Sequence, residues 1–262
     1  MCRLLALRAA EPFDPIPWIA PFAERCRESK EYQGHGWGVS WWDGKRWERY
    51  RSLTPIWEDV PDRLPAASLV LVHARSAFRN EGIVVENNMP FLEDRLAFAF
   101  NGELRGVRLS APGETGAARL FHLLRRFRAS SAGDGAGRPG RALTSASNTP
   151  DGQSTPDTPP NNQSTPDSTH AALDRLDRVV AARTDYVRAL NTVVSDGRDV
   201  WVGSRFSEDP DYFTLWRTCL PGWSGGGVVV SSERFELPGI MPAWAPIPNR
   251  TTLKLDMEDR CS

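Results

Sequence analysis

The chain has 262 residues, and its 32 basic and 33 acidic side chains give a net charge of −1. This balance excludes the strongly basic surface that is typical of nucleic-acid-binding proteins, so we expect no nucleic-acid partner. With 40% hydrophobic and 25% charged residues, the composition is that of an ordinary soluble globular protein. No apolar run approaches the roughly 18 residues needed to span a bilayer, and the first residues lack a signal-peptide pattern. We therefore predict a cytoplasmic protein without membrane contact.

The elements before residue 129 are two helices and several strands. Apolar residues recur at helical spacing over 18–26 and over 120–127, which predicts two helices. Short β-prone runs over 37–42, 68–74 and 95–100 predict strands between them.

Residues 129–169 interrupt this pattern. Gly, Pro, Ser, Thr, Asn and Asp dominate the segment, which buries too little apolar surface to offset its ordering entropy, so we predict a disordered insertion. A long amphipathic helix is predicted to follow directly, with apolar residues spaced from Leu173 to Leu190, and then strands over 199–203, 227–231 and 251–256. We therefore predict an α+β fold and a single domain, 1–262, that tolerates the insertion.

Cysteine and histidine carry the next signals. The cysteines Cys2, Cys26, Cys219 and Cys261 are scattered without a CxxC pair, so they indicate neither a disulfide framework nor a zinc finger and are expected to be reduced. The histidines lack metal-ligand spacing, and we assign no metal and no cofactor.

Cys2 is a candidate nucleophile because it follows Met1 directly. Removal of Met1 would place a thiol and a free α-amine on one residue, and an α-amine that titrates near ~7.7 to 8.0 can take the thiol proton at neutral pH. Taken alone, a cysteine at the second position is more often accidental.

Two further clusters follow strands. Arg75 comes just after an apolar run, where its guanidinium can bind a ligand carboxylate through two parallel hydrogen bonds or serve as an ordinary salt-bridge partner. Asn101 and Gly102 follow the predicted strand 95–100, where they make either a plain turn or an oxyanion hole of one side-chain amide and one backbone N–H.

Five short motifs follow one another along the chain: Met1–Leu5, Gly34–Val39 with its GxG start, His73–Ala77, Asn87–Phe91 and Phe100–Glu103. In this order they resemble the class II glutamine amidotransferase family of N-terminal-nucleophile hydrolases. The resemblance looks closest to the stand-alone branch that includes the γ-glutamyl hydrolase of ergothioneine synthesis. It implies a four-layer αββα sandwich.

The resemblance also implies site roles. Cys2 would be the nucleophile, Arg75 would bind the α-carboxylate of a glutamyl group, and Asn101 with Gly102 would form the oxyanion hole. Family members usually carry an aspartate for the substrate ammonium at the position that Gly116 holds here, and Glu114 is the candidate substitute. The acidic stretch 204–213 is a solvated loop or a second source of this anionic contact.

Two functions from different classes remain open. The first is an amidohydrolase that cleaves a γ-glutamyl or related small-molecule amide through a cysteine thioester. The alternative is a non-catalytic or glutaminase subunit that binds a ligand or passes ammonia to a separate synthetase. A homodimer and a separate synthetase partner both stay open.

Overall fold

The computed structural model describes residues 1–133, 167–219, 226–237 and 241–255. Its α-helices are α1 (Ile16–Arg27), α2 (Ile56–Asp59), α3 (Gly116–Gly133), α4 (Ser168–Ala182) and α5 (Pro210–Phe213), with short 3-10 helices η1 (Phe78–Asn80) and η2 (Val85–Asn87). Its strands are β1 (Arg3–Phe13), β2 (Trp37–Trp42), β3 (Trp47–Ser52), β4 (Ala67–Ala74), β5 (Phe91–Glu93), β6 (Leu96–Arg105), β7 (Tyr186–Ser195), β8 (Val200–Ser204), β9 (Trp216–Cys219), β10 (Gly227–Ser231), β11 (Ala245–Pro246) and β12 (Thr251–Lys254).

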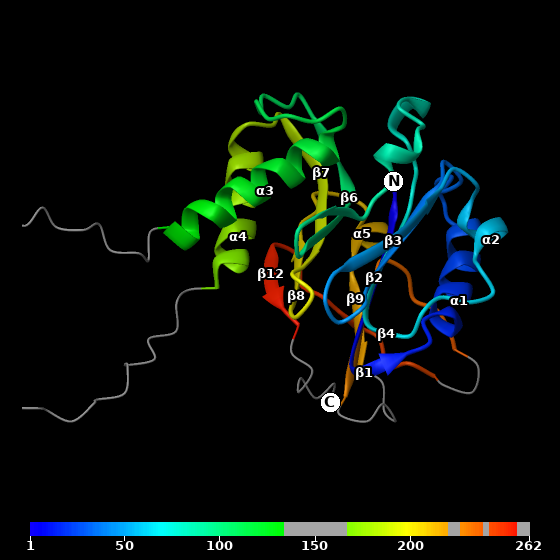
Figure 1. Ribbon diagram of the computed structural model, residues 1–262. Helices are drawn as coiled ribbons and strands as arrows, with labels where there is room; N and C mark the ends of the chain where they lie inside the picture. Colours follow the sequence, from blue (N-terminus) through cyan, green and yellow to red (C-terminus); the bar gives the residue numbers. More distant parts are fainter. Residues whose placement is uncertain (134–166, 220–225, 238–240, 256–262) are drawn as a thin grey trace, which may run out of the picture.

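The described strands form two antiparallel sheets. The first sheet has the order β11-β9-β10-β1-β4-β2-β3, and the second has the order β12-β8-β7-β6-β5. Helix α1 covers the outer face of the first sheet, whereas α3 and α4 cover the outer face of the second (Figure 1). The layers are therefore helix, sheet, sheet and helix, which confirms the predicted αββα sandwich.

Alternation along β1 separates two hydrophobic cores. Leu5 and Leu7 belong to the core beneath α1, whereas Leu4 and Ala6 belong to the core that includes the second sheet. Successive side chains of a strand point to opposite faces, so Cys2 continues the face of Leu4. The first residues of the chain thus lead toward the space between the two sheets.

Strand β6 presents Asn101 to the space between the two sheets. Phe98 stacks on Phe121 of α3, with ring centroids 5.5 Å apart, so Phe98 faces the helix layer. Ala97, Ala99 and Asn101 then face the first sheet, because they lie on the opposite side of the strand. Strand β6 packs against both β1 and β4 in this layer.

The chain from Asn101 to Gly102 is part of a strand, contrary to the turn interpretation. Strand β6 continues to Arg105, and neither residue has a positive φ. A Cβ atom on Gly102 would collide with the carbonyl oxygen of Ala189 in β7, so glycine permits the close approach of the two strands.

The helix predicted after the insertion is shorter than expected. Helix α4 ends at Ala182, and Leu190 lies in β7. The backbone N–H of Asp185 donates to the carbonyl of Arg105 at 3.0 Å, so the chain already pairs with β6 at that point. Apolar spacing alone did not separate the last helical turn from a strand that is buried on both faces.

The edges of the predicted insertion are helical. Helix α3 runs to Gly133 and α4 begins at Ser168, so 129–133 and 168–169 belong to these helices. Asp167 caps α4 by accepting from the backbone N–H groups of Thr169 and His170. The central part of the prediction, 134–166, lies outside the described residues.

Cys2 and Cys26 are free thiols, whereas Cys219 is disulfide-bonded. The expectation that all cysteines are reduced is therefore wrong for Cys219, because scattered sequence positions do not reveal which thiols the fold brings together. None of the helices in the described ranges is long and apolar enough to cross a membrane.

Candidate active site

Cys2 lies beside the end of β4. The antiparallel register pairs Arg3 with Ala74, which brings the start of β1 to the residues that follow β4. The backbone N–H of Ser76 donates to Cys2 Sγ at 3.4 Å, and Sγ lies 3.6 Å from the Ser76 carbonyl oxygen. Burial raises the pKa of the Cys2 thiol, while the N-terminal ammonium and Arg75 act in the opposite direction.

Arg75 is buried and held by neutral acceptors. Its Nη1 donates to Asn88 Oδ1 at 3.2 Å and to the Val84 carbonyl at 3.4 Å, and its Nη2 donates to the Gly82 carbonyl at 2.7 Å. Within the described ranges, no carboxylate forms an ion pair with Arg75. Burial lowers its pKa, whereas the Cys2 thiolate favours its charged form. An oriented guanidinium without a counter-ion suits a ligand carboxylate.

The Gly-His-Gly segment fixes the backbone around Arg75. His35 N–H donates to the Arg75 carbonyl at 3.1 Å, and Arg75 N–H donates to the Gly36 carbonyl at 2.9 Å. Ala77 N–H donates to His35 Nδ1 at 2.8 Å. Burial and the Arg75 charge both lower the pKa of His35, which keeps its ring neutral and its Nδ1 able to accept.

Asn88 connects Arg75 to the first sheet. Its Nδ2 donates to the Ser52 carbonyl at 2.7 Å and to the Trp37 carbonyl at 3.4 Å, while its Oδ1 accepts from Arg75. The Met89–Pro90 peptide bond, one residue further along, is cis. The motif around Asn88 therefore holds the arginine in place.

Asn101 is completely buried, yet neither Nδ2 nor Oδ1 has a hydrogen-bond partner among the described residues. Its register partner in β7 is Asn191, whose Nδ2 donates to the Phe213 carbonyl at 2.7 Å. A buried polar group without a partner costs about 1–3 kcal/mol. An amide that faces the layer between the sheets and bears this cost is available to a group that arrives there, such as a developing oxyanion.

His73 is a second buried polar group in this layer, and sequence reasoning treated it only as part of a motif. Neither ring nitrogen has a hydrogen-bond partner within the described chain. The backbone of Phe100 lies close enough to raise the pKa of the His73 ring slightly. Burial and the nearby Arg75 charge lower the pKa of His73 to about 3. The ring is therefore neutral at physiological pH and does not supply a cation.

Glu114 lies apart from these groups. It is exposed in the loop before α3 and makes no hydrogen bond or ion pair with any described residue. Gly116, the first residue of α3, has open space where a Cβ atom would stand. The structure therefore does not bring Glu114 into contact with Cys2 or Arg75, and its binding role stays a prediction.

Sequence reasoning missed the residues that hold Met1. The N-terminal ammonium forms an ion pair with Glu31, and the Met1 carbonyl accepts from Gln33 Nε2 at 2.6 Å and from the Tyr212 hydroxyl at 3.1 Å. Only the acidic stretch 204–213 gave a signal, because it contains Tyr212 and carboxylates. The other residues lie in a short loop without a distinctive pattern.

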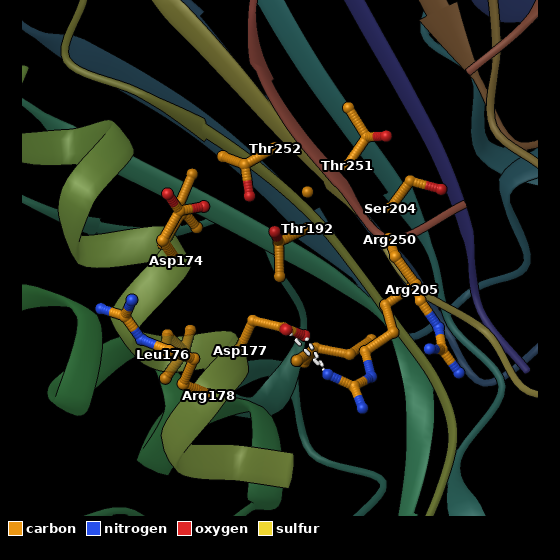
Figure 2. Close-up of a pocket in the computed structure, with 13 residues that line it drawn as sticks. Asp174, Leu176, Asp177, Arg178, Thr192, Ser204, Arg205, Arg250, Thr251 and Thr252 are labelled. Carbon is orange, nitrogen blue, oxygen red and sulfur yellow. Dashed lines mark hydrogen bonds and ion pairs between the residues drawn. The ribbon is translucent and has the colours of Figure 1, made fainter. Parts of the chain in front are cut away.

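The cavity drawn in Figure 2 is not lined by Cys2, Arg75 or Asn101. It has a volume of about 210 Å³ and is formed between α4 and the outer face of the second sheet. Asp177 of α4 accepts from Arg205 there, with its two oxygens at 2.8 and 2.7 Å from Nη1. Thr192 lines this cavity, whereas its neighbour Asn191 faces the opposite side of the strand. No group of three or more His, Cys, Asp or Glu within the described ranges could hold a metal ion.

Comparison with known proteins gives matches in structure only. No family model matches the chain, and no curated protein matches it. Three solved structures with the same architecture are a predicted glutamine amidotransferase from Pseudomonas aeruginosa, a glutamine aminotransferase class-II domain protein from Silicibacter pomeroyi and the glutamine phosphoribosylpyrophosphate amidotransferase of B. subtilis.

The P. aeruginosa protein superposes with a TM-score of 0.58 at 15% identity, over 97% of this chain and 96% of that chain. For the S. pomeroyi protein the TM-score is 0.55 at 17% identity, over 97% and 94%. For the B. subtilis enzyme it is 0.57 at 16% identity, over 97% of this chain and 47% of that one, so the chain spans about half of that enzyme's length. The chain has the fold of the class II glutamine amidotransferases.

Proposed function

We propose that the chain is an amidohydrolase that cleaves a γ-glutamyl or related small-molecule amide through a thioester on Cys2. The observation that carries the proposal is the contact between Cys2 and the segment of Arg75: a thiol at the start of β1, hydrogen-bonded to Ser76 and adjacent to a buried guanidinium without a carboxylate partner in the described chain. A nucleophile beside a carboxylate-binding group is what a γ-glutamyl substrate requires.

The proposed reaction begins after Met1 has been removed. The α-amine of Cys2 takes the thiol proton, and the thiolate attacks the amide carbonyl while Arg75 binds the substrate carboxylate. The Asn101 amide and the Gly102 N–H stabilise the oxyanion. The tetrahedral intermediate breaks its C–N bond, the leaving amine receives the proton, and water then hydrolyses the thioester to release the acid and the free thiol.

An intact-mass experiment with a glutamine-mimicking electrophile tests the proposal. Loss of Met1 together with one adduct, mapped to Cys2 and absent in Cys2→Ala, is the expected result. Glutamate release from a panel of γ-glutamyl amides, lost in Cys2→Ala, would then identify turnover. A Cys2→Ala variant that retains turnover would refute the mechanism.

The alternative, a subunit that binds a ligand or passes ammonia to a separate synthetase, gives a different result in the same experiment. A chain that keeps Met1 and takes no adduct favours ligand binding without catalysis. A chain that forms the adduct but releases ammonia from glutamine only when a synthetase is added favours the glutaminase role.

A further inference from the structure

Met1 occupies a built site beside the nucleophile. Its ammonium lies on the Glu31 carboxylate, and its carbonyl oxygen accepts from Gln33 and Tyr212. Its side chain packs against a small apolar cluster formed by Ala189, Tyr212 and Phe213, against which Phe206 also packs. We call these surroundings of Met1 (Glu31, Gln33, Ala189, Phe206, Tyr212 and Phe213) the Met1 site.

The Met1 site is acidic. Arg188 binds Glu31 at 3.1 Å, and it also binds Glu103, Glu208 and Asp209 at 3.4, 2.6 and 2.9 Å. A second guanidinium, that of Arg105, pairs with Glu103. These two guanidinium groups face four carboxylates. A third guanidinium, that of Arg3, lies 3.8 Å from the Tyr212 ring centroid but is paired with Glu233, so carboxylates remain in excess and the Met1 ammonium adds positive charge beside them.

Two buried polar groups support a ligand-binding role for this site. Burial raises the pKa of Tyr212 to about 12, so its hydroxyl stays a donor at physiological pH. Gln33 is completely buried, and its Oε1 has no hydrogen-bond partner within the described ranges, although its Nε2 donates to Met1. The site thus holds a carboxylate for a cation, two donors for a carbonyl and one unused acceptor.

The proposed reaction indicates where the leaving amine of the substrate must lie relative to Cys2 and Met1. The thiol of Cys2 points to Ser76 and the Arg75 side, which receives the acyl group. The α-amine of Cys2 must deliver a proton to the departing nitrogen, so the leaving amine has to lie beside Cys2 N. Met1 is attached at that nitrogen, and its ammonium is separated from it only by the Cα and carbonyl carbon of Met1.

We propose that, after removal of Met1, the Met1 site receives the leaving-amine part of the substrate and selects a leaving amine that carries a second, positively charged nitrogen a few bonds from the amide. This inference rests on the proposed function and names its substrate class: γ-glutamyl amides of compact cationic amines. Glu31 binds the cation, and Gln33 and Tyr212 bind polar atoms between the cation and the amide.

Two substrates of the same size test the proposal, γ-glutamyl-ethylenediamine and γ-glutamyl-propylamine, which differ only in the terminal charge. The protein is prepared with Cys2 as its first residue, and its mass is verified. We expect kcat/KM for glutamate release to be about tenfold or more higher for the cationic amide. Glu31→Gln should remove this preference by lowering kcat/KM for the cationic amide alone, and Glu31→Asp should retain part of it.

Glu28→Gln is the matched control. It makes the same charge change near Glu31 in the chain, but its carboxylate pairs with Arg25 on the surface and does not touch Met1. This variant should keep the preference. Equal rates for the two amides in the parent protein, or an equal loss for both in Glu31→Gln, would overturn the inference; the second result would mean that Glu31 holds the α-amine of Cys2 itself.

A binding measurement separates this inference from the proposed function. In the Cys2→Ala chain without Met1, calorimetry should give tighter binding of the cationic amide, and the difference should disappear in the Glu31→Gln double variant. Preferential binding without turnover in the Cys2 protein would support the Met1 site and refute the amidohydrolase. Turnover without any preference would support the amidohydrolase and refute the role of the Met1 site.

Discussion

The buried amide of Asn101 allows activity and stability to be separated by mutation. Asn101 and Asn191 face each other in neighbouring strands, and both are completely buried. Asn191 donates to the Phe213 carbonyl at 2.7 Å and accepts from the Arg205 N–H at 3.1 Å, whereas the Asn101 amide has no partner in the described chain. Replacing each by alanine therefore removes the same atoms from very different surroundings.

For Asn101→Ala we expect a large loss of activity and a small change in stability. Loss of one oxyanion donor lowers kcat by about 10² to 10³, or roughly 2.7–4 kcal/mol of transition-state stabilisation. The free energy of unfolding should stay within about 1 kcal/mol of the parent value, because removal of an unpaired buried amide relieves a desolvation cost that offsets the lost packing.

For Asn191→Ala we expect the reverse. The buried Phe213 carbonyl and the part-buried Arg205 N–H lose their partner, and at about 1–3 kcal/mol each the free energy of unfolding should fall by about 2–6 kcal/mol. The kcat of the folded protein should stay within a few-fold of the parent value. Urea unfolding and saturating glutamate-release assays on both variants measure these quantities. If Asn101→Ala loses as much stability as Asn191→Ala, or keeps its kcat, the oxyanion assignment is wrong.

Three more predictions concern titration and the insertion. Burial raises the thiol pKa of Cys2 and raises that of Cys26 further, so alkylation followed by mass spectrometry should label Cys2 at a lower pH than Cys26. Because the Arg75 charge lowers the Cys2 pKa, Arg75→Gln should shift the pH dependence of Cys2 labelling to higher pH. The pKa of His73 is about 3 in the folded protein and about 6.5 in the unfolded chain, so the free energy of unfolding falls as the pH drops below 6.5. Urea unfolding at pH 7 and pH 5 measures this fall, which should be smaller by about 2 kcal/mol in His73→Gln than in the parent protein. Replacing 134–166 with a short Gly-Ser linker should leave both turnover and the melting temperature unchanged, and a loss of soluble protein would show that the segment is structural.

The fold could be predicted largely from the order of its motifs and from apolar periodicity. The strand predicted over 37–42 coincides with β2, and the run over 227–231 coincides with β10. These runs are flanked by glycine or polar residues, so their ends are marked in the sequence. The predicted helix wrongly includes Leu190 of β7, because a strand buried on both faces carries no alternation and a spacing of three or four residues fits either structure.

The strand character of Asn101–Gly102 could not be read locally. Asn-Gly has a strong intrinsic preference for turns, but pairing with β7 across the sheet overrides it, and that pairing depends on residues some ninety positions away. The same long-range pairing decides which face Asn101 presents. Sequence reasoning therefore identified the residue, whereas its burial without a partner, which is the physical basis for the oxyanion proposal, depends on the packing of the two sheets.

The position of the anionic contact illustrates the same limit. Glu114 is the sequence-based candidate because it is close to the position that carries an aspartate in the family that the motifs resemble, yet it lies exposed and unpaired among the described residues. Glu31 is remote from that position in sequence but contacts the first residue of the chain. A carboxylate needs only to reach the ligand, and any loop at the rim can supply one, so its position in the sequence is weakly constrained. Cys2 and Arg75 are different, because adjacent strands fix where both must stand. The proposed nucleophile and the proposed acyl-binding group could therefore be predicted from motifs, whereas the residues proposed to select the leaving group had to be found in the structure.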